Sequence, residues 1–340
     1  MQLSDIGGEF GFIEHIRVTF AGTKVEGLTV PIGDDAAVLD VPPDRQVVVT
    51  TDAAIEGVHF RRDWSDPYSI GWKVAAANLS DVAAMGGDPT FTFVSLALPA
   101  EETVEWLERM YDGLCDCLNR YGARLAGGDT NSTTGGLVIS VTQMGTVPRG
   151  QALTRSGAKV GDVLLVSGTL GDSAAGLALL SECGPLKADK ISRSAVKAHR
   201  RPQPRVVAAR AARETGHVHA AMDISDGLVG DVPKMCAASG VGARINAADL
   251  PLSEAIKAAA KELDQSPVDL ALSGGEDYEL LLAVAPGDVL AVCDAVAATG
   301  TVLTPIGEII RAGFHIVGPD GTELTTERRG WDHFTPQPQP

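Results

Sequence analysis

Six short acidic motifs, spread over most of the chain, restrict how it can fold. Each places carboxylates beside glycine, a hydroxyl or another carboxylate: Gly33-Asp34-Asp35, Thr50-Thr51-Asp52, Asn78-Leu79-Ser80-Asp81, Gly127-Gly128-Asp129, Asp223-Ile224-Ser225-Asp226-Gly227 and Gly274-Gly275-Glu276-Asp277. Carboxylates gathered in one fold repel each other, and bound cations relieve that repulsion. Hard oxygen donors beside small residues favour Mg²⁺, which proteins hold through a few carboxylates and substrate phosphates. The motifs therefore predict a magnesium–nucleotide site for phosphoryl transfer.

Length and charge narrow the class of protein. The 340 residues exceed what one core usually holds, so two domains are expected. With 44 acidic against 28 basic residues, the formal charge of −16 disfavours nucleic acid or an anionic membrane as the main partner. No apolar run reaches the roughly 18 residues of a membrane helix, and the N-terminus lacks the basic and apolar segments of a signal peptide. The odd number of cysteines, five, is typical of reduced thiols in a cytoplasmic protein.

Apolar periodicity predicts a mixed fold, α+β with α/β character. Strands are expected near 35–40, 46–52, 90–98, 137–147, 163–167, 218–223, 242–246, 279–285 and 302–310. Helices are expected near 67–86, 101–121, 171–182, 201–214, 227–239, 252–262 and 287–299. Pro148-Arg149-Gly150 marks a boundary between an N-terminal domain of 1–150 and a C-terminal domain of 151–334. The proline-rich segment 335–340 is expected to be a disordered tail.

Each motif also has a purely structural interpretation. Gly33-Asp34-Asp35 is typical of a tight turn, and Thr50-Thr51-Asp52 is expected at the end of a strand. Ser80 or Asp81 could cap a helix, although a carboxylate within this apolar stretch is costly to bury unpaired.

The later motifs carry the same ambiguity. Ser225 or Asp226 could cap the helix that follows Asp223, but capping leaves the second acid unused. Gly274-Gly275 could form a ligand-facing loop or a β-bulge. Gly168-Thr169-Leu170-Gly171-Asp172 resembles a glycine loop, yet it could simply start a helix. The surplus of acids favours metal binding.

Other nucleotide-binding signatures are missing from the sequence. It has no Gly-x-x-x-x-Gly-Lys-Ser/Thr phosphate loop, no His-Arg-Asp kinase set and no Gly-x-Gly-x-x-Gly fingerprint. Arg155 is either a phosphate-binding cation or a surface residue. His217 and His219 share one face of an expected strand, but without a third ligand they do not indicate zinc. His59 is better placed for function because it follows the Thr50-Thr51-Asp52 strand.

The ordered set of motifs resembles the thiamine-monophosphate kinase family, within the aminoimidazole ribonucleotide synthetase-like superfamily. The resemblance covers nearly the whole chain. Besides the acidic motifs it includes Gly8-Glu9-Phe10, Glu56-Gly57-Val58-His59-Phe60, Ala152-Leu153-Thr154-Arg155-Ser156-Gly157-Ala158, Gly168-Thr169-Leu170-Gly171-Asp172 and Gly330-Trp331-Asp332-His333-Phe334. Single motifs occur across the superfamily, whereas the His59 and Trp331 segments are specific to the kinases.

The resemblance implies a two-domain homodimer. Its N-terminal domains would form a β-barrel across the dimer interface, flanked by helices, and each chain would add a C-terminal α/β domain. ATP and thiamine monophosphate would bind near the junction of the two domains. The implied reaction is direct transfer of the ATP γ-phosphate to thiamine monophosphate, giving thiamine diphosphate and ADP, the last step of thiamine diphosphate biosynthesis.

Residue roles carried over from the family fall into three sets, and none is a covalent nucleophile. Several Mg²⁺ ions would be held by Asp34, Asp35, Thr50, Thr51, Asp52, Asp81, Asp129, Asp223 and Asp226. ATP would contact Tyr111, Gly128, Asp129, Arg155 and Ser225. Thiamine monophosphate would contact His59, Glu276 and Trp331, whose indole suits stacking on a cationic thiazolium.

Rival functions make different predictions. Selenophosphate synthesis needs a reactive cysteine or selenocysteine near the N-terminus, and the first cysteine of this chain is Cys115. Aminoimidazole ribonucleotide synthesis predicts activity on a formylglycinamidine ribotide. A nucleotide-sensing or scaffold protein would bind Mg·ATP without releasing ADP, but binding alone would not require so many acidic residues.

Overall fold

The computed structural model describes residues 1–21, 25–33 and 36–324. The chain forms two compact units. Unit 1 comprises Met1–Val82 and Gly87–Gly150, and unit 2 comprises Ala83–Gly86 and the chain from Gln151 onward. Each unit contains its own sheet and its own buried apolar core.

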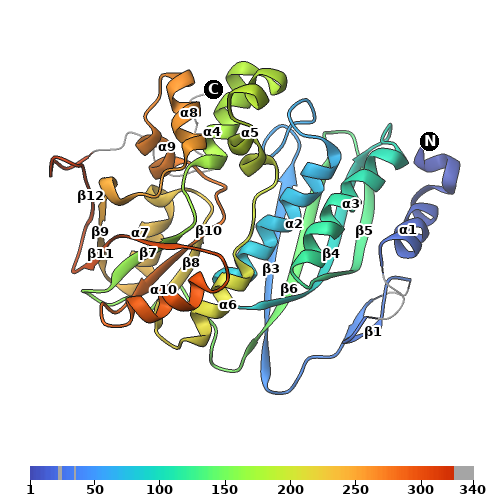
Figure 1. Cartoon of the computed structure of the whole chain (residues 1–340). Helices are drawn as coiled ribbons and strands as arrows, with labels where there is room; N and C mark the ends of the chain where they lie inside the picture. The colour runs from blue at the N-terminus through green and yellow to red at the C-terminus, as the bar shows by residue number, and fades with distance from the viewer. Residues whose placement is uncertain (22–24, 34–35, 325–340) are drawn as a thin grey trace. The chain divides into compact units, whose positions relative to one another are not determined.

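Unit 1 is built on a four-stranded sheet of order β3-β6-β4-β5. Its strands are β3 (Arg45–Ile55), β6 (Val138–Pro148), β4 (Asp88–Pro99) and β5 (Arg124–Thr133). Only β4 and β5 are parallel, and the other two pairings are antiparallel. Helices α2 (Pro67–Ala84) and α3 (Val104–Arg120) cover one face of the sheet (Figure 1). The unit also contains α1 (Gly8–Thr19) and a small antiparallel sheet of β1 (Leu28–Val30) and β2 (Val38–Leu39).

Two glycines let α2 and α3 approach each other closely. A Cβ atom on Gly71 would lie 1.9 Å from the carbonyl oxygen of Met110. On Gly113 it would lie 1.9 Å from the carbonyl oxygen of Tyr68. The backbones of the two helices can therefore pack this closely only because both positions are glycine and carry no side chain.

The Thr103 side chain caps α3 by accepting a hydrogen bond from the Trp106 backbone N–H at 3.3 Å.

Unit 2 contains a six-stranded sheet of order β12-β9-β11-β7-β10-β8. Its strands are β7 (Val163–Ser167), β8 (Val218–Ile224), β9 (Gly242–Asn246), β10 (Glu279–Val284), β11 (Leu303–Ile310) and β12 (Phe314–Val317). Only the β12–β9 pairing is parallel. The strand β10 is buried along its whole length.

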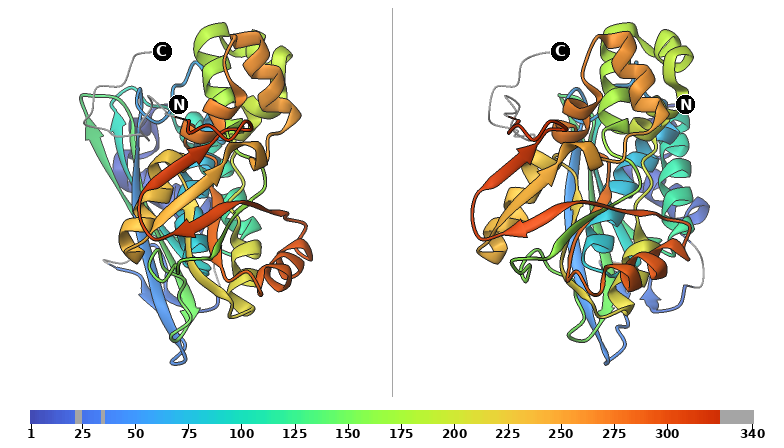
Figure 2. Two further views of the ribbon diagram at one scale, coloured as in Figure 1. Left: turned by 90° about the vertical axis from the view of Figure 1, so that its left-hand side faces the viewer. Right: turned by 60° about the vertical axis from the view of Figure 1, so that its left-hand side comes forward.

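The helices of unit 2 form separate groups around this sheet. They are α4 (Asp172–Cys183), α5 (Pro185–Arg200), α6 (Val206–Glu214), α7 (Leu228–Ser239), α8 (Glu254–Leu263), α9 (Pro267–Ser273) and α10 (Val289–Ala297). Helices α4, α5 and α8 pack against one another, as the views of Figures 1 and 2 show. Helix α7 packs on β8 and β9, while α6 contacts α10.

Most of the predicted elements are confirmed, and the strands at 163–167 and 242–246 match to the residue. The expectation of a helix over 201–214 is wrong at its start. Helix α6 begins at Val206 because Pro202 and Pro204 separate it from α5. The sequence also did not indicate α1, α5, α9, β1, β5 or β12. Strand β5 was obscured because it contains Gly127, Gly128 and several short polar residues, which have low β propensity.

The mixed α/β architecture with two units agrees with the expected fold class. In the described parts of the chain the three sheets are open, and none closes into a barrel. Within the same residues, no helix is long and apolar enough to cross a membrane.

Candidate functional site

The first acidic group of unit 1 joins β3 to α2. The Thr50 hydroxyl donates a hydrogen bond of 2.6 Å to Oδ2 of Asp81. Asp81 and Ser80 lie inside α2, so the alternative in which either of them caps a helix is wrong. The Thr51 side chain lies on the opposite face of the sheet, where its hydroxyl donates to the Val141 carbonyl at 3.2 Å. The structure therefore brings Thr50 and Asp81 together and separates Thr51 from them.

Thr50-Thr51-Asp52 lies within a strand and does not end one. Strand β3 continues to Ile55 because it pairs with β6 along its whole length. In the register of the sheet, Asp52 pairs with Val141, Val141 with Val94, and Val94 with Gly128. Asp52 and Gly128 thus lie on one row at opposite edges of the sheet, about 14 Å apart at three strand spacings. Within one chain, the sheet therefore does not bring Asp52 next to Asp129.

The Gly127-Gly128-Asp129 motif lies in the edge strand β5. A Cβ atom on Gly128 would lie 2.1 Å from the carbonyl oxygen of Val94, so the pairing with β4 itself requires glycine here. The exposed Asp129 carboxylate accepts a hydrogen bond of 2.6 Å from the Asn131 amide. The motif thus has a structural role in the sheet besides its predicted contact with ATP.

Tyr111 lies in the core of unit 1. Its ring packs against Phe12 and Phe20, with centroid separations of 6.3 and 5.5 Å. Burial raises the pKa of its hydroxyl. These contacts join α3 to the N-terminal helix, and the predicted contact of Tyr111 with ATP stays a prediction.

His59 lies in a tight connection after β3. Its Nδ1 accepts a hydrogen bond of 3.1 Å from the Ile55 backbone N–H, so the neutral imidazole carries its proton on Nε2. Lys73 donates to the His59 carbonyl at 3.2 Å. Arg62 pairs with Glu56 at 2.8 Å and thereby holds the start of this connection. The Ile55 N–H therefore helps to orient the ring of His59.

In unit 2, two of the acidic motifs lie side by side. Strands β8 and β10 pair so that Asp223 faces Leu280, which places both motifs at the same end of the strands. The Glu276 backbone N–H donates to the Ser225 carbonyl at 2.8 Å. A Cβ atom on Gly275 would lie 2.6 Å from the same carbonyl oxygen, so this close approach requires glycine. The structure therefore brings Asp223, Ser225 and Asp226 next to the segment that carries Glu276.

Asp231 and Lys234 on α7 hold the turn that contains Asp226. Oδ2 of the buried Asp231 accepts hydrogen bonds from the backbone N–H groups of Ser225 and Asp226 at 3.0 and 2.9 Å. Lys234 forms ion pairs with Asp226 and, at 2.8 Å, with Asp231. Desolvation raises the pKa of Asp231, although Lys234 opposes this rise.

These contacts correct the capping alternative. Helix α7 has Gly227 at its N-cap and no capping hydrogen bond from a side chain, so neither Ser225 nor Asp226 caps it. The sequence interpretation overlooked Asp231 and Lys234. Their spacing of three residues within the expected helix of 227–239 was the available signal.

The segment with Arg155 runs beside the free edge of β8. The Ala221 backbone N–H donates to the Thr154 carbonyl at 2.8 Å, and the Ser239 hydroxyl donates to the Arg155 carbonyl at 3.1 Å. Ala221 lies two residues before Asp223. The backbone of Arg155 is thus held close to the strand that ends in the Asp223 motif.

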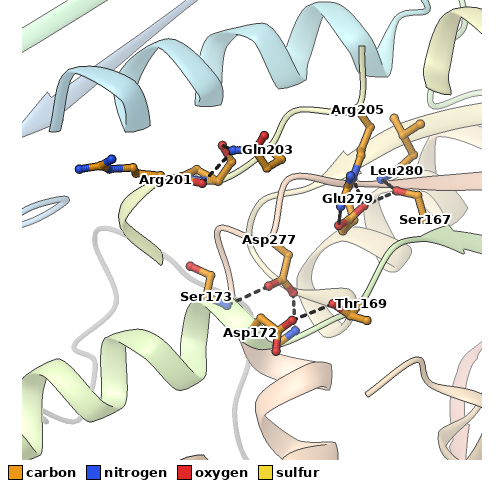
Figure 3. Close-up of polar contacts among 12 residues, drawn as sticks. Ser167, Thr169, Asp172, Ser173, Arg201, Gln203, Arg205, Asp277, Glu279 and Leu280 are labelled. Atoms are coloured by element: carbon orange, nitrogen blue, oxygen red, sulfur yellow. Dashed lines mark hydrogen bonds and ion pairs between the residues drawn. The ribbon is translucent and has the colours of Figure 1, made fainter. Parts of the chain in front are cut away.

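A second group of polar contacts follows Glu276 in unit 2 (Figure 3). The buried Glu279 forms an ion pair with Arg205 and accepts a hydrogen bond from the Ser167 hydroxyl. Asp277 accepts hydrogen bonds from the backbone N–H groups of Gly171 and Ser173. No separate role for Asp277, Glu279 or Arg205 follows from local sequence patterns, because their partners lie more than 70 residues away in the chain.

The predicted metal ligands are all hard oxygen donors, which fit Mg²⁺ in their chemistry. Among the residues that the structure describes, no three acidic, histidine or cysteine side chains are grouped closely enough to hold a metal ion. Asp34, Asp35 and Trp331 lie outside the described residues. The described geometry therefore supplies parts of a donor set, namely Thr50 with Asp81 and the turn from Asp223 to Asp226.

Family comparison defines the class first. Residues 33–147 match the N-terminal domain of AIR synthase related proteins, and residues 159–318 match the C-terminal domain of the same proteins. This chain is therefore an AIR synthase related protein.

Individual relatives identify the family within this class of proteins. The thiamine-monophosphate kinase of Escherichia coli (strain K12) is 40% identical over 331 residues, which cover 96% of this chain and 98% of that protein. The thiamine-monophosphate kinase of Bacillus subtilis (strain 168) is 37% identical, with 90% and 93% covered. This chain belongs to the thiamine-monophosphate kinase family.

Solved structures agree with this assignment. The crystal structure of thiamine-monophosphate kinase from Stenotrophomonas maltophilia K279a has a TM-score of 0.81 and 38% identity, covering 92% of this chain and 96% of that one. The structure of AaThiL complexed with AMPPCP and TMP has a TM-score of 0.73 and 34% identity, with 98% and 99% covered.

Proposed function

We propose that this chain transfers the γ-phosphate of ATP directly to thiamine monophosphate, giving thiamine diphosphate and ADP, the last step of thiamine diphosphate biosynthesis. The observation that carries the proposal is its similarity, over nearly its whole length, to AaThiL in complex with AMPPCP and TMP. The acidic motifs of both units support it, because transfer between two anionic phosphates requires charge compensation.

The proposed metal ligands are Thr50, Thr51, Asp52, Asp81, Asp129, Asp223 and Asp226, together with Asp34 and Asp35. Bound Mg²⁺ ions would neutralise the phosphates and orient them for in-line transfer. Thr50 supports this proposal because its hydroxyl orients the Asp81 carboxylate.

The proposed ATP contacts are Tyr111, Gly128, Asp129, Arg155 and Ser225, and the proposed contacts to thiamine monophosphate are His59, Glu276 and Trp331. The phosphate of the acceptor is already deprotonated near neutral pH, since the second pKa of a phosphate monoester is about 6. No strong general base and no covalent nucleophile are therefore needed. The protein's own contribution is to position two repelling anions.

The proposed assembly is a homodimer in which the sheets of two copies of unit 1 form a β-barrel. The face of the sheet opposite α2 and α3 supports this proposal. Val47, Val49 and Ile55 alternate along this face of β3 and expose 43%, 58% and 40% of their surface. Exposed apolar rows of this kind are typical of protein interfaces.

Two further assignments also stay proposals. The division into domains of 1–150 and 151–334 is supported by the two compact units, whose boundary lies between Gly150 and Gln151. The predicted tail of 335–340 lies outside the described residues. A cytoplasmic location is supported by the five cysteines, all of which are free thiols.

A coupled assay of ADP release tests the function. We expect ADP release with ATP, Mg²⁺ and thiamine monophosphate, and none with thiamine or without an acceptor. Activity with thiamine alone would overturn the choice of substrate. Binding of Mg·ATP without ADP release in the presence of thiamine monophosphate would indicate a sensor or scaffold protein.

A further inference from the structure

The loop of Gly274–Tyr278, called here the Glu276 loop, has an unusual backbone. Glu276 and Tyr278 have φ angles of 65° and 53°, in the left-handed region that residues with a Cβ atom rarely adopt. Such conformations persist only where surrounding contacts determine them. The contacts that hold this loop therefore identify what its shape depends on.

Backbone hydrogen bonds fix the two ends of the Glu276 loop. Gly274 donates to the Leu270 carbonyl at 2.9 Å, and Tyr278 donates to the Ile224 carbonyl at 2.9 Å. Between them, Glu276 donates to the Ser225 carbonyl at 2.8 Å. These bonds place the backbone of the loop, but they do not orient the Glu276 carboxylate.

Asp277 attaches the Glu276 loop to the start of α4. Its Oδ2 accepts a hydrogen bond from the Gly171 N–H at 2.6 Å, and its Oδ1 accepts one from the Ser173 N–H at 3.3 Å (Figure 3). Helix α4 has Gly171 at its N-cap, and glycine has no side chain that could accept a capping hydrogen bond. Asp277 thus supplies the cap from a distant part of the chain.

His199 provides a contact on the Glu276 side chain itself. Its Nδ1 lies 3.3 Å from Oε2 of Glu276 and 3.3 Å from the hydroxyl of Ser173. Both His199 and Ser173 are buried. Ser173 therefore takes part in both attachments, through its N–H to Asp277 and through its hydroxyl to His199.

We propose that Asp277 and His199 are positioning residues that fix the Glu276 carboxylate for binding thiamine monophosphate. The inference rests on the proposed function, in which Glu276 contacts that substrate. Asp277 holds the backbone of the Glu276 loop against the start of α4. His199 holds the Glu276 carboxylate next to Ser173 at the same end of this helix. A carboxylate held in one orientation binds a cationic ring without first losing side-chain freedom.

The test compares steady-state kinetics of five single variants. Asp277→Asn keeps one acceptor oxygen but replaces the other by an NH₂ group, so that one of the two N–H bonds is lost. His199→Phe keeps a ring without a hydrogen-bonding nitrogen, whereas His199→Asn places an amide close to the position of Nδ1. Glu276→Gln measures the contribution of the carboxylate itself. Asp172→Asn is the matched control, because Asp172 accepts hydrogen bonds from Thr169 and Ser253 at the same end of α4 but does not hold the Glu276 loop.

We expect Asp277→Asn and His199→Phe to raise KM for thiamine monophosphate about tenfold, the loss expected for one charge-assisted hydrogen bond. KM for ATP should stay unchanged, and His199→Asn should restore most of the affinity for thiamine monophosphate. Asp172→Asn should lower the melting temperature as Asp277→Asn does, while leaving both KM values unchanged.

Three outcomes would overturn the inference. One is an unchanged KM for thiamine monophosphate in Asp277→Asn and His199→Phe although Glu276→Gln raises it. Another is an equal effect of Asp172→Asn, which would show a purely structural role of this helix end. The third is an unchanged KM in Glu276→Gln while ADP release persists, which would remove Glu276 from the substrate site without removing the kinase activity. Should Asp277→Asn fail to fold, the two His199 variants, which leave the α4 cap intact, decide the question.

Discussion

The Thr50 hydroxyl donates a hydrogen bond of 2.6 Å to the Asp81 carboxylate and so ties the edge strand β3 to helix α2. A carboxylate held by such a bond presents its remaining lone pairs in a fixed direction. Groups that orient metal ligands in this way contribute strongly to metal affinity and activity in other proteins. We therefore expect Thr50 and Asp81 to act together in binding the proposed metal ion.

Replacing the proposed metal ligands should strongly lower activity without unfolding the protein. We expect Asp52→Asn, Asp81→Asn and Asp223→Asn each to lower kcat on the order of 100-fold or more, because each removes ligand charge. Thr50→Val should lower activity roughly 10- to 100-fold through loss of orientation. ADP release at several Mg²⁺ concentrations measures these effects, and excess Mg²⁺ should restore part of the activity. Near-normal turnover in all three Asn variants, judged beside Asp320→Asn as a surface control, would exclude the metal assignment.

The crossing of α2 and α3 should not tolerate a methyl group. Gly71→Ala and Gly113→Ala would each place a Cβ atom 1.9 Å from a backbone carbonyl oxygen. We expect each to lower the free energy of unfolding by about 1–3 kcal/mol, because the helices must move apart. Urea unfolding measures the change. Gly287→Ala, which meets open space, is the matched control, and equal stability of all three variants would contradict the close packing.

The stability contributed by Asp277 should depend on pH. Desolvation raises the pKa of Asp277 well above its ordinary value of 3.8; the N–H groups of Gly171 and Ser173 oppose the rise, while Glu279 and Asp172 add to it. Between the unfolded-state and folded-state pKa values, the folded protein binds a proton that the unfolded chain has released. The bound proton stabilises the folded state. Its contribution is fully present below the unfolded-state pKa and is lost as the pH rises through the folded-state pKa.

The measurement is the difference in unfolding free energy between the wild type and Asp277→Asn over the acidic to neutral range. We expect the advantage of the wild type to shrink as the pH rises, because asparagine does not titrate. A difference that grows with pH would show that the pKa of Asp277 is lowered in the folded protein.

The exposed face of the unit 1 sheet should mediate dimer formation. Val49→Glu places a charge in the middle of the apolar row on β3, where burial against a second copy would desolvate it. We expect light scattering to show half the mass of the wild-type protein. Leu290→Glu on α10, at an apolar side chain that is even more exposed, should leave the mass unchanged. A monomeric wild type would refute the proposed dimer.

Local sequence patterns were sufficient for most elements of the fold. The periodicity of α3, the apolar run of β7 and the alternation of β9 placed these segments accurately, because side-chain spacing and burial agree within one element. Strand β5 was not predicted, because glycine has low β propensity. The close pairing with β4 nevertheless requires glycine at these positions. The motif order likewise indicated the family, which the comparisons confirm.

Contacts between distant segments had to come from the folded chain. Nothing in the local sequence joins Asp277 to the start of α4, or His199 to Glu276. The acidic motifs alone predicted carboxylates in a shared site, because charge and residue type are properties of each residue. Which carboxylates have a cation, an N–H group or a hydroxyl as partner depends on strand register and helix packing, and these arise only when segments far apart in the chain are buried together.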